Sequence, residues 1–326
     1  MQQEKVKITF LSDLYQKSRL PGKLGHLVTG LRWRRAVRRY FKKAKPTVVH
    51  CHLNVGQMIV PAIRELKNTR LFYTVHSDPD KYWGNGKNQK EVRAIQKLLS
   101  HNDIAFFALH SDSIPKIKKY FGESSQIEVL NNAVDTAAFV PNAHVRVAYR
   151  KKLNIDDNTV VIGHIGRFFE PKNHEFLIEV FSELYKKRKN FHLILVGDGD
   201  LRNKIEKKAE ELSLTGCISF LGNRSDIPEL LSSFDLFLFP SLWEGLPLTL
   251  IEAQAAQLPC FVSDSVTKAV NRSNLMTYLP LEAGAEKWAE AILSYRKKAV
   301  EYHDLQDYDI HTVLDHLTDL YGIEKY

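Results

Sequence analysis

The stretch Val160-Val-Ile-Gly-His-Ile-Gly166-Arg167-Phe-Phe-Glu-Pro171-Lys172-Asn-His174 decides the fold of this chain. It opens with an apolar run rich in β-branched residues, typical of a buried strand, and a glycine turn follows directly. Pro171 then stands near the start of a helical pattern, where its missing N–H costs nothing. This strand, turn and helix predict the first unit of a doubly wound α/β domain.

The same alternation continues on both sides of this stretch and predicts two Rossmann-like domains with parallel sheets. The predicted strands cover residues 6–11, 47–51, 70–75, 104–109, 126–130, 160–165, 192–196, 218–221, 236–239 and 259–263. The predicted helices cover residues 26–44, 56–67, 88–101, 112–121, 173–188, 200–213, 226–232, 247–257, 285–298 and 309–322.

The domain boundary is predicted near residues 142–150, where a turn-rich piece precedes the strand at 160. This divides the chain into an N-terminal domain, 1–145, and a second domain, 146–305. A helix at about 306–326 is expected to pack back on the first domain. Ligands of such paired domains bind at the carboxyl ends of the strands, in the cleft between the domains.

Composition places the chain among globular proteins: of its 326 residues, 44% are hydrophobic and 26% are charged. This excludes a disordered, collagen-like or small disulfide-linked chain. Apolar runs are far shorter than the roughly 20 residues of a membrane span, and the start has no secretory apolar region. Three widely spaced cysteines, Cys51, Cys217 and Cys260, predict buried thiols in a reducing compartment, so we expect the cytoplasm.

Positive charge is concentrated at one end of the chain. Residues 1–50 hold 13 basic and 2 acidic residues, whereas the whole chain has a net charge of +8. Residues 26–44 combine this charge with apolar residues at near-helical spacing and predict an amphipathic basic helix. A solvated helix face and a surface that binds anionic membranes both explain it. No recognised nucleic-acid motif accompanies the patch, so we expect no nucleic-acid partner.

A second informative stretch is Pro240-Ser-Leu-Trp-Glu244-Gly245-Leu246-Pro247-Leu-Thr-Leu-Ile-Glu252. It predicts a strand end, a loop and a helix whose first turn holds Pro247. Backbone N–H groups from Gly245 onward and the positive end of the helix dipole then offer an anion site. Glu252 can accept two hydrogen bonds from vicinal hydroxyls such as those of a ribose, and Glu244 can do so for a sugar. The alternative is a capping Glu244 and a surface Glu252.

Arg167 and Lys172 are predicted at the carboxyl edge of the sheet, after the glycine turn at Gly166. A planar guanidinium and an ammonium point charge can together neutralise a diphosphate and stabilise it as a leaving group without a metal. Ordinary surface cations are the alternative.

These motifs resemble the retaining glycosyltransferases of family 4, which have the GT-B fold and use nucleotide-diphosphate sugars. The resemblance covers about residues 46–326, and it implies that domain 1–145 is the acceptor-side domain and that domain 146–305 binds the nucleotide sugar. The matching elements are Gly166-Arg167-Phe168 with Lys172-Asn173, Leu195-Val-Gly197-Asp-Gly199, Phe220-Leu-Gly222-Asn-Arg224-Ser-Asp226-Ile-Pro and Glu244…Glu252-Ala. The resemblance implies that Arg167 and Lys172 bind the donor diphosphate, Glu252 the ribose and Glu244 the transferred sugar. The segment from Gly222 to Arg224 would lie near the base.

In the first half, Thr74-Val75-His76 places His76 where the family uses a histidine near the donor phosphate and sugar; an ordinary strand-end histidine is the alternative. Ser263-Asp-Ser-Val-Thr267 resembles the branch that builds capsular polysaccharides and exopolysaccharides. The family opens with a strand and a Gly-Gly loop, which have no counterpart here. We therefore expect an abbreviated N-terminal domain, in a truncated chain or in one whose acceptor side is built differently.

Other chemistries are less well supported. Asp78-Pro-Asp80 and Asp198-Gly-Asp200 suggest a metal-dependent transferase, but one is in a polar loop and the other belongs to the glycine turn. Gly197-Asp-Gly199 lacks the third glycine of a dinucleotide site, and no nucleophile elbow is present. A glycosidase pair needs carboxylates that flank one bond, unlike Glu244 and Glu252.

We therefore expect a metal-independent retaining glycosyltransferase without a cofactor. It would move a hexose-type sugar from a nucleotide-diphosphate donor, UDP-linked in our prediction, to a lipid-linked or polysaccharide acceptor at the inner membrane face. The alternative is a non-catalytic nucleotide-sugar-binding or partner protein with an incomplete N-terminal domain.

Overall fold

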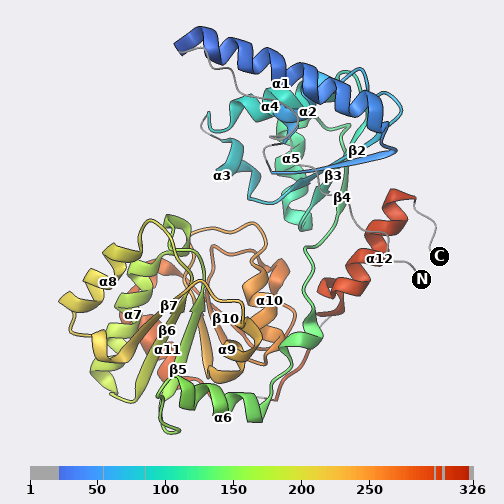
Figure 1. The fold of residues 1–326 in the computed structure, drawn as a ribbon. Coiled ribbons are helices and arrows are strands. Elements are labelled where there is room, and N and C mark those ends of the chain that lie inside the picture. Colours follow the sequence, from blue (N-terminus) through green and yellow to red (C-terminus); the bar gives the residue numbers. More distant parts are fainter. Residues whose placement is uncertain (1–21, 54, 85, 297–298, 303–304, 323–326) are drawn as a thin grey trace. The chain divides into compact units, whose positions relative to one another are not determined.

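The computed structural model describes residues 22–53, 55–84, 86–296, 299–302 and 305–322 (Figure 1). The chain divides into two compact units, the first ending at Leu130 and the second beginning at Asn131. Each unit is an α/β domain built on a parallel sheet, as the sequence predicts. The strand predicted at residues 6–11 lies outside the described residues.

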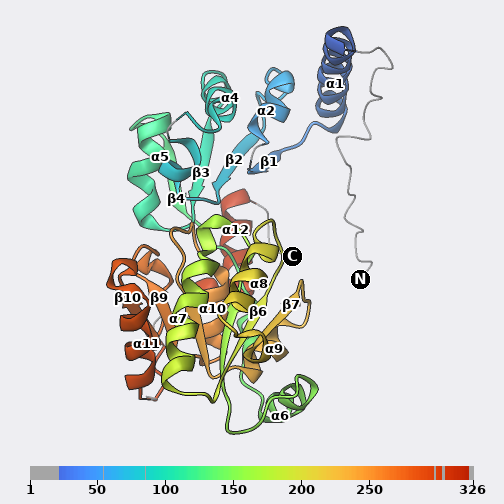
Figure 2. The same ribbon diagram turned by 90° about the vertical axis from the view of Figure 1, so that its left-hand side faces the viewer.

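The first unit has a four-stranded sheet in the order β1-β2-β3-β4, and all its pairings are parallel. Its strands are β1 (Val48–His52), β2 (Arg70–Val75), β3 (Ile104–Ala108) and β4 (Gln126–Val129). Its helices are α1 (Gly22–Ala44), α2 (Gly56–Ile59), α3 (Pro79–Trp83), α4 (Gln89–Leu99) and α5 (Ile114–Phe121). Figure 2 shows the strands in this order, with α1 on the side of β1.

One helix predicted for this unit is shorter than expected, and one helix was not predicted. The helix predicted over residues 56–67 is one turn of α2 followed by the 3-10 turn Val60–Ala62. Pro61 has no N–H to continue the α-helical ladder, so the helix stops before it. Helix α3 was not predicted because five residues are too few for a periodic pattern; the carboxylate of Asp78 caps it by accepting from Lys81 N at 3.0 Å.

The second unit has a six-stranded parallel sheet in the order β10-β9-β8-β5-β6-β7. Its strands are β5 (Val160–Ile165), β6 (Phe191–Val196), β7 (Ile218–Gly222), β8 (Leu236–Phe239), β9 (Cys260–Ser263) and β10 (Met276–Leu279). Its helices are α6 (Ala143–Lys152), α7 (His174–Lys187), α8 (Arg202–Glu211), α9 (Ile227–Ser233), α10 (Leu248–Ala255), α11 (Gly284–Ser294) and α12 (Ile310–Tyr321). Strand β10 was missed because it is a partly exposed edge strand without an apolar run.

Glycine at position 163 allows the centre of this sheet to pack closely. A Cβ atom at Gly163 would lie 1.9 Å from Cδ2 of Phe234, which follows α9. Real Cβ atoms do not approach a ring carbon this closely. The glycine of the Val160–Ile165 strand is therefore explained by the packing of β5, and not by ligand binding.

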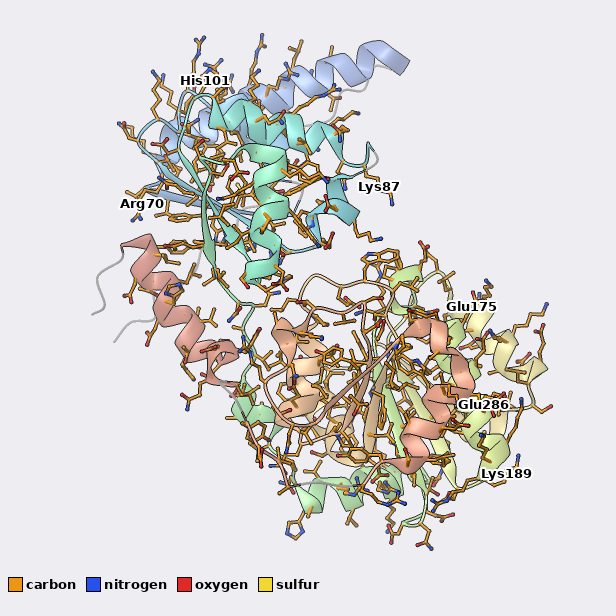
Figure 3. All side chains as sticks on the ribbon, turned by 180° about the vertical axis from the view of Figure 1, so that it is seen from behind. Arg70, Lys87, His101, Glu175, Lys189 and Glu286 are labelled. Atoms are coloured by element: carbon orange, nitrogen blue, oxygen red, sulfur yellow. The ribbon has the colours of Figure 1, made fainter. Side chains whose placement is uncertain are left out.

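On one face of the sheet, α7, α8 and α11 cover a continuous apolar core that includes Leu177, Phe181, Ile205 and Trp288. Their outer surfaces carry ion pairs, among them Glu175 with Lys204 at 2.5 Å and Glu286 with Lys187 at 3.3 Å. Figure 3 shows Glu175 and Glu286 on the outside of these helices. This rigid layer positions the loops at the sheet edge.

The residues around the predicted boundary belong to the second unit. Residue 145 lies within α6, which was not predicted, and Arg146 of this helix bonds Asp235 at 2.5 Å. Val134 likewise exchanges backbone hydrogen bonds with the start of α12: Val134 N donates to Tyr308 O at 2.8 Å, and Ile310 N donates to Val134 O at 3.0 Å. The two compact units divide after residue 130, ahead of the predicted 145. The packing of residues 306–326 on the first domain stays a prediction.

Two composition-based predictions can be compared with the structure. The three cysteines are free and buried, as predicted. Among the described helices, none is long and apolar enough to cross a membrane.

Candidate functional site

Two glycine-rich loops meet at the carboxyl ends of β5 and β6. Gly166 N donates to Val196 O at 2.9 Å, and Phe168 N donates to Asp198 O at 3.0 Å. Gly197 has φ of +131°, and a Cβ atom there would lie 2.2 Å from Gly166 O. The loops are therefore locked against each other, which fixes the backbone on both sides of Arg167.

A pocket of about 700 Å³ opens beside these loops, within the usual size range of ligand sites. Four predicted site residues line it: Gly166, Arg167, Arg224 and Glu252. The other lining residues are Ile165, Val196, Gly197, Asp198, Gly199, Asn223, Ile227 and Thr249. Parallel strands deliver these residues from separate parts of the chain to one sheet edge, as expected for a doubly wound fold.

Arg167 is exposed, and its guanidinium carbon lies 4.2 Å from the centre of the Phe169 ring. Among the described residues, no carboxylate pairs with it. Stacking on an aromatic ring holds the planar group while its N–H donors stay available. Arg167 is thus a positioned and uncompensated cation at the mouth of the pocket.

Lys172 and Glu244 form an ion pair, with Nζ 2.8 Å from Oε1. Both side chains are largely buried, and the ammonium also lies 4.8 Å from the centre of the Phe239 ring. Neither residue lines the pocket directly. The stem of Lys172 nevertheless packs on Gly166, where an added Cβ would lie 3.2 Å from Cδ. The pair is therefore adjacent to the pocket, and each charge neutralises the other.

Two buried histidines pack beside this lysine. The rings of His164 and His174 meet edge to face with centroids 4.8 Å apart, and His164 Nδ1 bonds Leu238 O at 2.8 Å. Burial, followed by the charge of Lys172, lowers the pKa of His174 to about 4. Burial also lowers the pKa of His164 well below its usual value. Both rings are neutral at pH 7, so they do not repel the ammonium.

The predicted loop from Pro240 to Pro247 is tied to the 3-10 turn that holds Lys172: Leu242 N donates to Pro171 O at 2.8 Å, and Asn173 Nδ2 donates to Pro240 O at 3.2 Å. Helix α10 begins at Leu248, so Pro247 is its N-cap residue and not part of the first turn. Gly245 and Leu246 lie in the loop before this helix and are not among the residues that line the pocket.

Thr249 is a pocket residue that the sequence analysis missed. Its Oγ1 is buried and, among the described residues, has no hydrogen-bond partner. Thr249 precedes Glu252 by three residues on α10, so both lie on one helix face. That spacing was the available signal. An unpaired hydroxyl in a pocket is ready to bond a polar ligand, since leaving it unpaired costs free energy.

Glu252 has an unusually high pKa for a glutamate. Burial raises its pKa to about 7. The carboxylate has lost hydration and, in the part of the chain that the structure describes, no cation pairs with it, which favours its neutral form. A ligand that donates hydrogen bonds to the carboxylate would restore its ionised form, so the group is prepared for a hydroxyl-bearing partner.

Arg224 at the same pocket is held by Asp226, with Nε 2.7 Å from Oδ1, and Asp226 also accepts from Tyr149 OH at 2.8 Å. The Arg224 guanidinium beside it holds the pKa of Asp226 well below its usual range. Gly222, with φ of +66°, accepts from Gly197 N at 2.8 Å. Gly222 therefore supports the neighbouring loop, whereas Arg224 and Asn223 face the pocket.

His76 directly follows β2 in the first unit, and its Nε2 lies 2.8 Å from Nδ1 of His52. Burial lowers the pKa values of both rings. The predicted role of His76 near the donor phosphate and sugar stays a prediction.

The two Asp-x-Asp strings are engaged with cations. Asp78 pairs with Lys116, and Asp80 lies 2.8 Å from Lys119. Asp198 lies 3.6 Å from Arg202. Among the described residues, no group of three or more His, Cys, Asp or Glu is placed to hold a metal.

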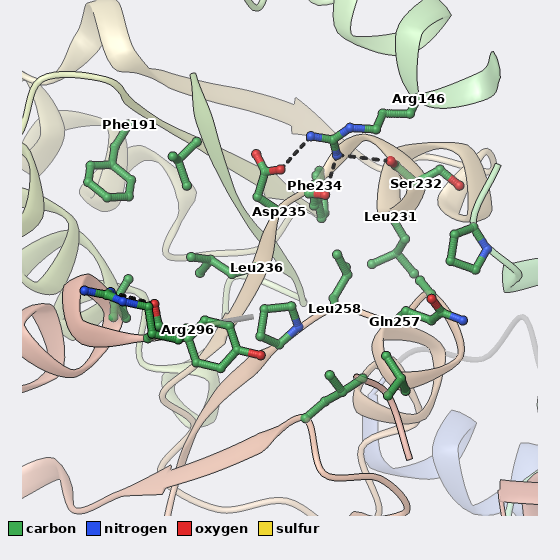
Figure 4. Close-up of a pocket in the computed structure, with 18 of the residues that line it drawn as sticks. Arg146, Phe191, Leu231, Ser232, Phe234, Asp235, Leu236, Gln257, Leu258 and Arg296 are labelled. Atoms are coloured by element: carbon green, nitrogen blue, oxygen red, sulfur yellow. Dashed lines mark hydrogen bonds and ion pairs between the residues drawn. The ribbon is translucent and has the colours of Figure 1, made fainter. Parts of the chain in front are cut away.

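A second cavity, of about 540 Å³, lies at the opposite edge of the second sheet, where β5, β6 and β8 begin (Figure 4). Apolar side chains dominate its lining, and the carboxylate of Asp235 there is already paired with Arg146 and, at 3.1 Å, with Arg150. No predicted site residue lies in this cavity. The four predicted site residues that line a pocket lie at the carboxyl edge of this sheet instead.

Comparisons with known proteins agree with this geometry. The family profile described as glycosyl transferases group 1 matches residues 145–308, and the profile glycosyltransferase family 4 matches residues 12–138. The chain belongs to the family 4 glycosyltransferases with the GT-B fold, which confirms the family recognised in the sequence.

EpsF of Bacillus subtilis (strain 168), which is named as a glycosyltransferase, is 34% identical over 266 residues, 79% of this chain and 68% of that protein. An Escherichia coli UDP-Gal:alpha-D-GlcNAc-diphosphoundecaprenol alpha-1,3-galactosyltransferase is 29% identical over 68% of this chain, and the match spans 59% of that enzyme. The crystal structure of Anabaena HepE with UDP and glucose superimposes with a TM-score of 0.72 at 18% identity, over 94% of this chain and 85% of HepE. The last comparison shows the fold alone.

Proposed function

We propose that this glycosyltransferase moves a hexose-type sugar, with retention of configuration, from a UDP-linked donor to a lipid-linked or polysaccharide acceptor in cell-surface glycan synthesis. The observation that carries the proposal is the joint placement of Arg167 and Glu252 on one pocket, with the Lys172–Glu244 pair packed against it. HepE binds UDP on the same fold, and the Escherichia coli relative is named for a UDP-galactose donor and a diphosphoundecaprenol acceptor.

In this proposal the donor diphosphate is bound by Arg167 and Lys172. The exposed Arg167 guanidinium provides a planar pair of donors, and Lys172 provides a point charge. The hydroxyl of Thr249 extends this anion site at the start of α10, whereas the contribution predicted for the backbone N–H groups of Gly245 and Leu246, which lie outside the pocket lining, stays a prediction. Glu252 accepts from the ribose hydroxyls, and Arg224 with Gly222 lies near the base.

The reaction needs the sugar–oxygen bond to the diphosphate to break while the acceptor hydroxyl attacks from the same side. The proton of that hydroxyl passes to the leaving phosphate oxygen. Arg167 and Lys172 stabilise the negative charge that develops on the diphosphate, so no metal or cofactor is required. Glu244 orients the sugar. In the unliganded protein, Glu244 holds Lys172 in place through their ion pair.

The acceptor proposal includes a membrane surface. The basic residues of α1, inside the predicted 26–44 segment, would hold the protein at the inner face of an anionic membrane, where lipid-linked acceptors are found. Each basic residue close to such a surface contributes about 1 kcal/mol.

A thermal-shift screen with nucleotide-diphosphate sugars, followed by calorimetry on the best donor, tests the donor site. We expect stabilisation by a UDP-sugar that is lost in Arg167→Ala. Arg188→Ala is the matched control, because Arg188 is an exposed arginine at the opposite edge of the same unit. Equal donor binding by all three proteins would refute the assigned role of Arg167.

A further inference from the structure

A groove of about 470 Å³ on the first unit lies between α1, the α2 segment with its 3-10 turn, and α4. Its lining residues are Leu31, Trp33, Arg34, Arg35, Arg38, Gln57, Val60, Pro61 and Lys97. Four of these side chains are cationic and none is acidic. The groove comes from three elements that are held together by the core of the unit, since Val37 and Phe41 of α1 are buried in that core.

The cations of this groove are poorly compensated. Helix α1 has no acidic residue between Gly22 and Ala44. Arg38 Nε lies 3.1 Å from Oε1 of Glu65. Among the described residues, no carboxylate pairs with Arg34, Arg35 or Lys97. Like charges brought together without partners attract an anion, because binding one relieves their mutual repulsion.

Apolar side chains accompany these cations on the surface. Leu31 is 47% exposed and lines the groove with the partly buried Trp33, while Tyr40 on the same helix is 37% exposed. Tyr40 does not line the groove, but Leu31 does, and a binding site for a small soluble anion gains nothing from an exposed leucine. Cations beside exposed apolar and aromatic groups are the arrangement of a helix that lies in a membrane interface.

We infer that this groove binds the phosphate of an anionic phospholipid headgroup in a bilayer. Arg34 and Arg35 offer planar donor pairs to the phosphate oxygens, and Lys97 adds a point charge from α4. Leu31 reaches toward the acyl boundary. The inference rests on the proposed membrane association and sharpens it: a defined headgroup site replaces a diffuse attraction to the whole of α1.

Two charge-matched triple variants test the inference on vesicles of phosphatidylglycerol and phosphatidylcholine. The groove variant combines Arg34→Gln, Arg35→Gln and Lys97→Gln. The control variant combines Arg32→Gln, Arg39→Gln and Lys43→Gln, which are exposed residues of α1 outside the groove lining. Each variant loses two arginines and one lysine. In vesicle flotation we expect the groove variant to bind roughly 100-fold more weakly, and the control to lose less than about 10-fold.

The outcomes separate the inference from the proposals on which it depends. Equal losses in the two variants would overturn the headgroup site and leave a diffuse membrane attraction standing. Equal binding of the wild type to neutral vesicles would overturn both. Donor stabilisation by a UDP-sugar, measured on the same three proteins, tests the transferase assignment independently, and we expect it to be unchanged.

Two further measurements distinguish a phospholipid headgroup from a soluble phosphate as the ligand of the groove. Inorganic phosphate and glycerol phosphate at millimolar concentration should not displace the wild type from anionic vesicles; displacement would assign the groove to a soluble phosphate. Leu31→Gln keeps the charge of the groove, and we expect it to weaken vesicle binding about 5-fold in high salt, where apolar insertion dominates. Unchanged binding by Leu31→Gln would also contradict a site at the acyl boundary.

Discussion

The charged side chains around the donor pocket and those on α1 differ in how they are held and paired. Around the pocket, Lys172 pairs with Glu244, Arg224 pairs with Asp226, and the exposed Arg167 is held on the ring of Phe169. On α1, basic side chains are exposed and the helix has no acidic residue. Charges that neighbouring side chains hold in place preorganise a site for one ligand geometry, whereas exposed charges that are not held in this way suit a partner that is itself a charged surface. The predictions below test this contrast.

The largest effect is expected at the donor cations. Arg167→Ala and Lys172→Ala should each lower turnover by roughly 10²-fold or more, because each removes a charge that stabilises the leaving diphosphate. Steady-state kinetics with the UDP-sugar found by thermal shift measures the effect, with Arg188→Ala as the control. If both alanine variants turned over at the wild-type rate, the preorganised site would lie elsewhere.

Glu252→Gln should have opposite effects on stability and on donor affinity. The folded pKa of about 7 lies above the ordinary value of 4.5, so ionising Glu252 costs stability as the pH rises through this window. Removing that cost should stabilise the free protein by up to about 3 kcal/mol at pH 8 and by little at pH 4. Denaturant titrations at the two pH values measure the difference.

The same substitution should weaken donor binding about 10-fold at pH 8, because a neutral amide accepts from hydroxyls less strongly than a carboxylate. Wild-type affinity should rise with pH through about 7 and then level off, as Glu252 ionises. A pH-independent wild-type affinity would contradict the pairing of Glu252 with donor hydroxyls.

Salt should distinguish the two regions directly. Raising the salt concentration from 0.1 M to 1 M shortens the screening length from about 10 Å to about 3 Å. Binding to anionic vesicles through α1 should fall at least about 10-fold, whereas UDP-sugar binding in the pocket should change less. If salt weakened vesicle binding, measured by flotation, and UDP-sugar binding, measured by calorimetry, to the same extent, the proposed difference between the two regions would be wrong.

The smallest effect is expected from the Lys172–Glu244 pair in the unliganded protein. A double-mutant cycle with Lys172→Ala, Glu244→Ala and the double variant should give a coupling of about 1 kcal/mol in unfolding free energy, since each single change strands a largely buried charge. Lys186 and Glu183, an exposed pair at 2.7 Å on α7, provide the control, for which we expect about 0.5 kcal/mol or less. Similar coupling free energies for the two pairs would show that burial does not strengthen the Lys172–Glu244 ion pair.

The bounds of a strand were predicted accurately where both faces of the strand are buried. The strands Arg70–Val75 and Val160–Ile165 have the predicted bounds, because a buried parallel strand is a continuous apolar run. Strand Met276–Leu279 was missed because it is a partly exposed edge strand. Helices α3 and α6 were missed because their short or polar sequences show little periodicity, and contacts with distant residues such as Asp235 stabilise α6.

The candidate site likewise contains residues that the sequence predicted and residues that it did not. Arg167, Arg224 and Glu252 were predicted from motifs, and the structure brings them to one pocket. Thr249 was missed because its spacing from Glu252 is only a weak signal, and the lack of a partner for its hydroxyl among the described residues is visible only in the folded protein. The placement of Gly245 and Leu246 away from the pocket lining also required the folded loop.

By itself the sequence determined the family, the alternation of strands and helices, and the residue types at the sheet edge, since each of these is encoded in local patterns of apolar, glycine and charged residues. Only the tertiary structure decided that Lys172 is neutralised by Glu244, that Glu252 is half-buried with no cation paired to it among the described residues, and that Arg34, Arg35 and Lys97 share a groove. Burial and charge pairing join residues far apart in the chain, so the physical environment of a side chain exists only in the folded protein.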